Sequence, residues 1–425
     1  MKYINTIDNI DFNKIPIDVY WNKGDQKENL MHKIHSYPAK FPSFITSKAI
    51  ELAENKGINV NVVADMFCGC GTTAYEAARI GKNFWGCDIN PVATLIAQVK
   101  SFKYNGNILG KYYNKILESF PSVKLKSSQI NGLNSRLYYW YKNSEIKDLL
   151  KLKIAISENI THNSQYYKFF LCAFSNILKP TSMWLTKSIK PQYDPNKIPA
   201  NVIEAFKSQY NFMFKANESN DIMSNTKREI VNDNFLEINI DQQFADLIVS
   251  SPPYVTSYEY ADLHQLSTVW LGYTDDYKSL REGSIGSLYH QSDYNMDFNN
   301  LNDSGKSIIS ELYNVDKSKA KSAAKYFIDI QIAITKAFSL LNNNSLALFV
   351  IGNTEYKNAK INNALHLAES MLMAGFTDIE ISKRKISKKI LTPYRDTKGR
   401  FTTDSNSRKV YSEEFILIGR KYNGN

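Results

Sequence analysis

The sequence predicts an α/β fold, with a doubly wound, mostly parallel sheet that is interrupted by a large, mainly helical insertion. Three observations lead to this prediction. A strand, a glycine-rich turn, a helix and a second strand follow one another over residues 61–87. Residues 101–220 are rich in Lys, Asn and Tyr and show helical patterns with few strand signals. Sheet character then returns at 244–250 and 345–351.

The N-terminal elements follow from local patterns, taken in chain order. Apolar side chains recur at helical spacing over residues 44–56, and residues 61–67 are a short apolar run that ends in the glycine-rich turn. Helical character resumes at 72–81, and residues 83–87 indicate the next buried strand. The apolar stretch 166–178 is too short and too polar to span a bilayer, so it indicates a buried helix.

The C-terminal part predicts an antiparallel end to the sheet. Asp378–Ser382 and Glu414–Gly419 have strand character and frame a basic stretch. Two such strands around a long connection indicate a final β-hairpin.

Composition indicates a folded protein with a polyanionic partner. Hydrophobic residues make up 43% of the 425 residues and charged residues 22%, which allows a sizeable core and argues against wholesale disorder. Lys and Arg number 52 against 42 Asp and Glu, a net charge of +10. Such a balance suits nucleic acid, because each phosphate that is neutralised releases counterions. A basic protein without that partner is the alternative.

The cysteines and the N-terminus exclude several classes of protein. Cys68 and Cys70 form C-x-C, but no His or second cysteine pair stands at zinc-finger spacing, so neither a metal site nor a disulfide scaffold is expected. Residues 1–16 contain no apolar run of the kind found in signal peptides. We therefore expect a cytoplasmic protein with reduced thiols and no membrane or metal partner.

Two glycines and an acid mark a candidate cofactor site. Gly69 and Gly71 bracket a tight turn, where glycine lets the backbone approach a ligand. No Lys follows Gly71, so this is not a phosphate-binding P-loop, and Ala74 stands where the dinucleotide fingerprint has its third glycine. Asp88 ends the next strand, where a carboxylate accepts hydrogen bonds from ribose hydroxyls. Alternatively, Asp88 only caps a helix that begins near Pro91.

A second motif, Ser250-Ser-Pro-Pro-Tyr254, follows the apolar strand before it. Its two prolines fix a rigid turn, at the strand end where open α/β folds bind ligands. The Ser251 hydroxyl and the Pro252 carbonyl could together accept the two N–H bonds of an exocyclic amine. Tyr254 could stack on an extruded base. A strand-ending turn with a surface tyrosine is the alternative.

Together, these motifs resemble those of the amino-group (N4-cytosine and N6-adenine) DNA methyltransferases. DMFCGCGTT is similar to the family's cofactor motif and GCDINP to the motif after it. HSYPAKFP resembles the segment that lies against the methionine end of the cofactor, and SPPY resembles the catalytic tetrapeptide. The resemblance implies S-adenosylmethionine as cofactor and Ser251, Pro252, Pro253 and Tyr254 as catalytic residues. It implies cofactor contacts by Lys40, Phe41, Pro42, Asp65, Phe67, Gly69, Gly71, Thr72, Thr73, Asp88, Ile89, Asp233 and Ser250.

The resemblance also implies an architecture. It predicts a seven-stranded methyltransferase sheet with a terminal antiparallel hairpin. Residues 1–100 would hold the cofactor motifs and residues 221–425 the catalytic motif. In the motif order found here, the family usually places target recognition in the insertion, so residues 101–220 would read the sequence of double-stranded DNA.

Several target bases remain open at this point. Serine in the first position of the tetrapeptide is commoner in the N4-cytosine group, which favours cytosine N4, although some adenine N6 enzymes also use it. An RNA amino-methyltransferase typically carries Asn there and an added RNA-binding module, which is not seen. A DNA-binding subunit with a dead cofactor site would not need intact motifs. Cytosine C5 methylation requires a cysteine nucleophile, usually after proline, and none of the four cysteines follows one.

Three segments are candidates for contact with DNA. Trp184–Lys190 together with Tyr193 mixes cations and aromatic rings. Lys383–Arg400 holds eight cations and one acid, although a solvated hairpin would look the same. The loop with Arg281, Gly283 and Gly286 is the third. A cognate restriction endonuclease is a candidate protein partner.

Overall fold

The computed structural model describes residues 2–4, 10–23, 27–38, 40, 42–255, 260–287, 293–386, 394–395, 401–404, 406–409 and 413–422. One sheet of eight strands, in the order β1-β9-β13-β6-β5-β2-β3-β4, forms its centre. These strands are β1 (Lys2–Ile4), β2 (Val62–Asp65), β3 (Asn83–Asp88), β4 (Arg228–Asn232), β5 (Ala245–Ser250), β6 (Leu341–Ile351), β9 (Thr377–Lys385) and β13 (Glu413–Lys421).

The predicted fold class is confirmed. The β4-β3-β2-β5-β6 pairs are all parallel, and β13 pairs antiparallel with both β6 and β9 as the predicted hairpin. Beyond these seven strands, the N-terminal β1 pairs antiparallel with β9 at the edge. Strand β4 did not stand out in the sequence, because it is a short edge strand with no buried residue.

Alternate strand residues enter two separate hydrophobic clusters, as expected when both faces of a sheet are covered. On β5, Leu247 and Val249 pack with helices α1 (Phe44–Asn55) and α2 (Thr72–Arg79). Ile248 faces the other way, toward a cluster that includes apolar residues of three C-terminal helices. These helices are α13 (Asp303–Val315), α14 (Lys317–Leu340) and α15 (Asn363–Ala374).

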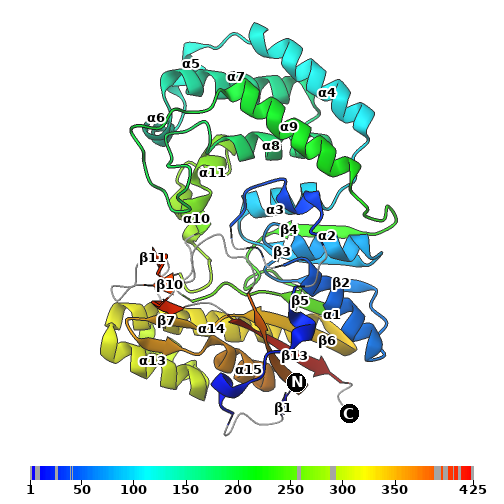
Figure 1. Ribbon diagram of the computed structural model, residues 1–425, viewed down its shortest axis with the longest axis vertical. Coiled ribbons are helices and arrows are strands. Elements are labelled where there is room, and N and C mark those ends of the chain that lie inside the picture. Colours follow the sequence, from blue (N-terminus) through cyan, green and yellow to red (C-terminus); the bar gives the residue numbers. More distant parts are fainter. Residues whose placement is uncertain are drawn as a thin grey trace.

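The insertion is helical, as predicted, and Figure 1 shows it stacked at one end of the molecule, far from β13. Its helices are α4 (Gly106–Ser119), α5 (Ser127–Asn131), α6 (Ser135–Trp140), α7 (Asn143–Asn159), α8 (Gln165–Ile177) and α9 (Val202–Glu218). One hydrophobic cluster joins them to α3 (Pro91–Lys100) and α11 (Gln265–Leu271). Because Val92, Leu95 and Ile96 of α3 belong to that cluster, the insertion and the sheet region share a core.

Net charge is concentrated in the insertion. Residues 101–220 hold 17 Lys and Arg against 7 Asp and Glu, whereas the rest of the chain holds 35 of each kind. The whole excess of positive charge therefore belongs to the helical region.

The remaining elements are short. They are η1 (Phe12–Lys14), η2 (Val19–Trp21), η3 (Leu30–Lys33), η4 (Phe120–Ser122), η5 (Tyr277–Arg281), α10 (Tyr260–Leu263), α12 (Tyr294–Asn300), β7 (Thr354–Tyr356), β8 (Ala359–Ile361), β10 (Tyr394–Arg395), β11 (Phe401–Thr402) and β12 (Arg408–Lys409). Within the described ranges, no helix combines the length and apolar character that crossing a membrane requires. The same ranges contain no cluster of metal-ligating side chains, and all four cysteines are free and buried.

Candidate active site

One buried carboxylate joins the two motifs. Asp65 is the last residue of β2, and Ser250 ends the neighbouring parallel strand β5. Asp65 Oδ1 accepts hydrogen bonds from Ser250 Oγ at 2.7 Å and from the Phe67 N–H at 3.1 Å, and Oδ2 accepts one from Thr73 Oγ1 at 2.9 Å. Burial raises the pKa of Asp65 to about 6. Asp65, Thr73 and Ser250 thus hold the glycine turn against the Ser-Pro-Pro-Tyr turn.

The glycine turn needs glycine for two physical reasons. Gly69 and Gly71 have φ of +49° and +74°, which L side chains rarely adopt. A Cβ on Gly71 would also lie 2.6 Å from the Ala97 Cβ, so the turn packs directly on α3. Thr72 and Thr73 follow as the buried first residues of α2.

Asp88 closes the turn from the next strand. Its Oδ2 accepts a hydrogen bond from the Gly69 N–H at 2.8 Å, and its Oδ1 accepts one from the Asn90 N–H at the same distance. Burial raises the pKa of Asp88 to about 6. Since Asp88 remains partly exposed, its lone pairs can still accept from a ligand.

The ends of β3 and β4 lie together beside this acid. The Asp233 N–H donates to the Asp88 carbonyl at 3.2 Å, and the Asp233 side chain is exposed. Ile89 lies under the loop of Gly283, where a Cβ would come within 3.1 Å of the Ile89 Cδ1. Phe67 is half-buried and packs edge-on against Phe235. The structure therefore brings the residues predicted for the ribose and adenine to one rim of the sheet.

An aromatic stack lies beside Gly69, and it includes His264, which the sequence offered as a possible wall of the base pocket. Tyr37 stacks on His264 at 5.0 Å, and a Cβ on Gly69 would lie 3.8 Å from the Tyr37 ring. The amide of Asn90 donates to His264 Nδ1 at 2.9 Å, and burial lowers the pKa of His264 to about 4. His264 is therefore neutral with its proton on Nε2, which has no partner among the described residues. The tyrosine of HSYPAKFP was the available signal for this stack.

The structure describes the HSYPAKFP segment before α1 except for residues 39 and 41. Lys40 is partly buried, donates to the His32 carbonyl at 2.5 Å and lies 3.7 Å from Glu28. Pro42 lies two residues before α1 and is partly exposed. Phe41 lies outside the described residues.

The Ser-Pro-Pro-Tyr turn is held by groups outside the motif. Ser251 Oγ donates to the Val350 carbonyl at 3.0 Å, and the hydroxyl of Tyr326 on α14 donates to the Pro253 carbonyl at 2.7 Å. Among the described residues, none bonds to the Pro252 carbonyl. That carbonyl and the lone pairs of Ser251 are thus two acceptors available to a substrate at the end of β5.

One expectation about the surroundings changes, and another stays untested. Trp184 is not a DNA-facing ring, because it is buried and stacked on Trp140. Tyr193 beside it is 39% exposed, and Lys187 and Lys190 are exposed. Most of Lys383–Arg400 lies outside the described residues, so its predicted grip on phosphates remains a prediction.

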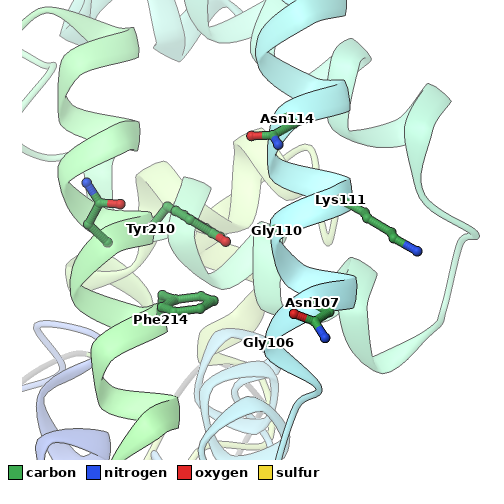
Figure 2. Close-up of a pocket in the computed structure, with 8 residues that line it drawn as sticks. Gly106, Asn107, Gly110, Lys111, Asn114, Tyr210 and Phe214 are labelled. Carbon is green, nitrogen blue, oxygen red and sulfur yellow. The ribbon is translucent and has the colours of Figure 1, made fainter.

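A hollow in the helical region lies apart from this site. Figure 2 shows it between α4 and α9, with the rings of Tyr210 and Phe214 opposite the two glycines of α4. Asparagine amides and Lys111 complete its lining. None of its lining residues belongs to the motifs at the sheet.

Comparisons with known proteins find similarity to DNA methyltransferases. A family model described as DNA methylase matches residues 5–99. The chain is 21% identical over 423 residues to the Type II methyltransferase M.MvaI of Kocuria varians, covering 93% of this chain and 92% of the relative. It is 25% identical over 316 residues to the Type II methyltransferase M.BsoBI of Geobacillus stearothermophilus, covering 66% and 59%.

A shorter match reaches 33% identity over 94 residues with the Type II methyltransferase M.MjaII of Methanocaldococcus jannaschii, and covers 22% of this chain and 17% of that one. The family model and these relatives confirm the predicted resemblance to amino-group DNA methyltransferases. S-adenosylmethionine is confirmed as the cofactor that this resemblance implies.

Proposed function

We propose that this chain, an S-adenosylmethionine-dependent DNA methyltransferase, methylates the N4 amine of cytosine at a specific sequence in double-stranded DNA. The observation that carries the proposal is the Asp65 carboxylate, which ties Ser250 to the glycine turn through Thr73 and the Phe67 N–H. A methyl donor on that turn and an amine on the next strand end would lie within one site. Positioning of this kind contributes roughly 7–11 kcal/mol at best.

The cofactor residues act as predicted in this proposal. Asp88 would accept from the ribose hydroxyls, with Ile89 and Asp233 beside the adenine, and Lys40 and Pro42 toward the methionine end. Asp65 and Ser250 would position the two turns rather than touch the cofactor, because both are buried and bonded to each other. Bound S-adenosylmethionine supplies an electrophilic methyl group.

Ser251 is suited to accept a hydrogen bond from the target amine. Its hydroxyl hydrogen is engaged with the Val350 carbonyl, so it meets a further polar group through its lone pairs. The Pro252 carbonyl is the second acceptor. Two acceptors match the two N–H bonds of an exocyclic amine and favour a pyramidal nitrogen, whose lone pair can then attack the methyl group. Serine at position 251, the commoner choice in the N4 group, favours cytosine.

The insertion would recognise the target. Residues 101–220 carry the whole excess of positive charge, which favours a polyanion. The ring centroids of Tyr139 and Tyr193 lie 5.2 Å apart, and the two residues are 55% and 39% exposed. Lys187 and Lys190 lie close to Tyr193 in sequence. The Type II methyltransferase relatives support a role in restriction-modification, with a cognate endonuclease as the partner.

Product analysis tests this function. The purified chain is incubated with labelled S-adenosylmethionine and plasmid DNA, the DNA is digested to nucleosides, and the modified base is identified by mass spectrometry. We expect N4-methylcytosine, at least about 100-fold less of it with Ser251→Ala, and normal amounts with the control Ser339→Ala on α14. Detection of N6-methyladenine instead would make adenine the target base, and unmodified DNA would overturn the proposed function.

A further inference from the structure

The hydroxyl of Tyr254 is held from the far end of the chain. It donates to Glu414 Oε1 at 3.1 Å, across 160 positions in sequence. On the other side, a Cβ at Gly352 would approach the tyrosine ring to 3.0 Å, so glycine there leaves room for the ring. The ring is thus fixed at both ends: by the rigid Pro-Pro backbone and by its hydroxyl.

Glu414 is itself fixed by an arginine. Arg384 Nε and Nη2 donate to Glu414 Oε2 at 2.9 and 2.5 Å, and this leaves Oε1 for Tyr254. The Arg384 side chain is 2% exposed and that of Glu414 15% exposed. The two residues face each other across β9 and β13, and the guanidinium lies over the Phe44 ring at 5.9 Å. Of the two carboxylate oxygens of Glu414, Oε1 therefore binds Tyr254 and Oε2 binds Arg384.

We propose that Glu414 and Arg384 are positioning residues that set the angle of the Tyr254 ring toward the target base. The proposal rests on the proposed function, in which Tyr254 stacks on that base. If the hydroxyl were unbound, the ring would be oriented only by its packing against Gly352 and the neighbouring hydrophobic cluster, because the turn itself fixes only its Cα. A charge-assisted hydrogen bond to a carboxylate locked by arginine holds it better than water does.

A purely structural role for the ion pair predicts something different. A buried ion pair is weak support for stability on its own, and removing one partner destabilises the fold wherever it lies. Such damage would not depend on whether position 254 carries a hydroxyl. A positioning role and a purely structural role therefore differ in whether the effect of changing Glu414 depends on the hydroxyl of Tyr254.

A double-mutant cycle on the full-length protein separates them. Tyr254→Phe and Glu414→Gln are each expected to lower kcat about 10-fold, and the double variant also about 10-fold rather than 100-fold, with little change in KM for S-adenosylmethionine. Glu413→Gln is the matched control: it is the neighbouring glutamate, is 38% exposed and pairs with Lys383 at 3.4 Å. It should leave kcat unchanged. Additive losses in the double variant would overturn the proposal.

A second measurement does not need turnover. In protein labelled with ¹³Cζ-tyrosine, the Tyr254 signal is the one that Tyr254→Phe removes. It should shift in Glu414→Gln and Arg384→Met and stay in place in Glu413→Gln. An unmoved signal in Glu414→Gln and Arg384→Met would sink the positioning role, even if the chain proved to modify another base or none. Failure of the proposed function would appear separately, as absence of N4-methylcytosine with the unaltered chain.

Discussion

The sheet region and the helical insertion carry charge in opposite ways. Outside residues 101–220 the charges balance, and carboxylates such as Asp65 and Asp329 are buried within hydrogen-bond networks. The insertion, which is described throughout, has an excess of ten cations, and none of its seven acids is buried. The sheet region buries carboxylates that fix loops, whereas the insertion has an excess of cations, of which some, such as Lys187 and Lys190, are exposed and others, such as Lys179 and Lys197, donate to loop carbonyls.

Under the proposed function, this contrast predicts that chemistry and attraction to DNA belong to different parts of the molecule. The two parts nevertheless share the hydrophobic cluster around α3, so deleting the insertion would expose Val92, Leu95 and Ile96. Side-chain substitutions in each part are therefore the cleaner way to test the division.

The largest effect is expected at the glycine turn. Gly71→Ala places a methyl group 2.6 Å from the Ala97 Cβ at a positive φ, and we expect about 100-fold weaker binding of S-adenosylhomocysteine. DNA affinity should change less than about 2-fold. Calorimetry and fluorescence anisotropy measure the two constants. Gly57→Ala, with φ of +81° and nothing within 4 Å, is the control for backbone strain alone. If Gly71→Ala weakened DNA binding as much as cofactor binding, cofactor binding and DNA binding would not belong to separate parts of the molecule.

A smaller effect is expected from the buried acid. The folded-state pKa of Asp65, about 6, lies above its ordinary value of 3.8, so the folded state binds the proton more tightly. This group therefore favours folding below about pH 4, and that contribution is lost as pH rises through 6. Asp65→Asn should remove a decline of about 1–3 kcal/mol in unfolding free energy between pH 4 and 7.

Denaturant titrations across that pH range measure the change. Asp88 has the same raised pKa, so the slope that it causes should persist in Asp65→Asn and disappear in Asp88→Asn. An unchanged slope in both variants would show that neither carboxyl controls stability.

The smallest effect is expected in the insertion. The double substitution Lys187→Gln with Lys190→Gln should weaken DNA binding about 10-fold and lower the slope of log K against log salt by about 1.8. Cofactor affinity should stay the same. Lys317→Gln with Lys321→Gln, two exposed cations on α14, is the matched pair on the neutral region. Equal losses in both pairs would mean that DNA contacts both regions alike.

The strands covered on both faces could be predicted from sequence. Strands β2, β3 and β5 and residues 346–351 of β6 are largely apolar runs, because both faces pack against other elements. The half-exposed β4 lacks that signal. The cofactor and catalytic motifs were equally visible, because their glycine and proline positions are local requirements of the backbone.

The supporting residues could not be predicted, because they act across long distances in sequence. Arg384 belongs to a basic stretch that suggested a solvated or DNA-facing hairpin, yet its side chain is buried against Glu414. Tyr326, which holds the Pro253 carbonyl, lies 73 positions away on a helix whose pattern indicates only burial. Nothing local distinguishes such residues from ordinary core or surface positions.

The short strand at the N-terminus has a practical meaning for handling the protein. With Lys2–Ile4 paired to Ile379–Ile381, the main-chain groups on that flank of β9 are occupied. A chain that lacked Lys2–Ile4 would leave these groups open as a template for a strand of another molecule. By covering this edge of β9, residues 2–4 are expected to limit aggregation through strand pairing. A purification tag is therefore better fused at the C-terminus.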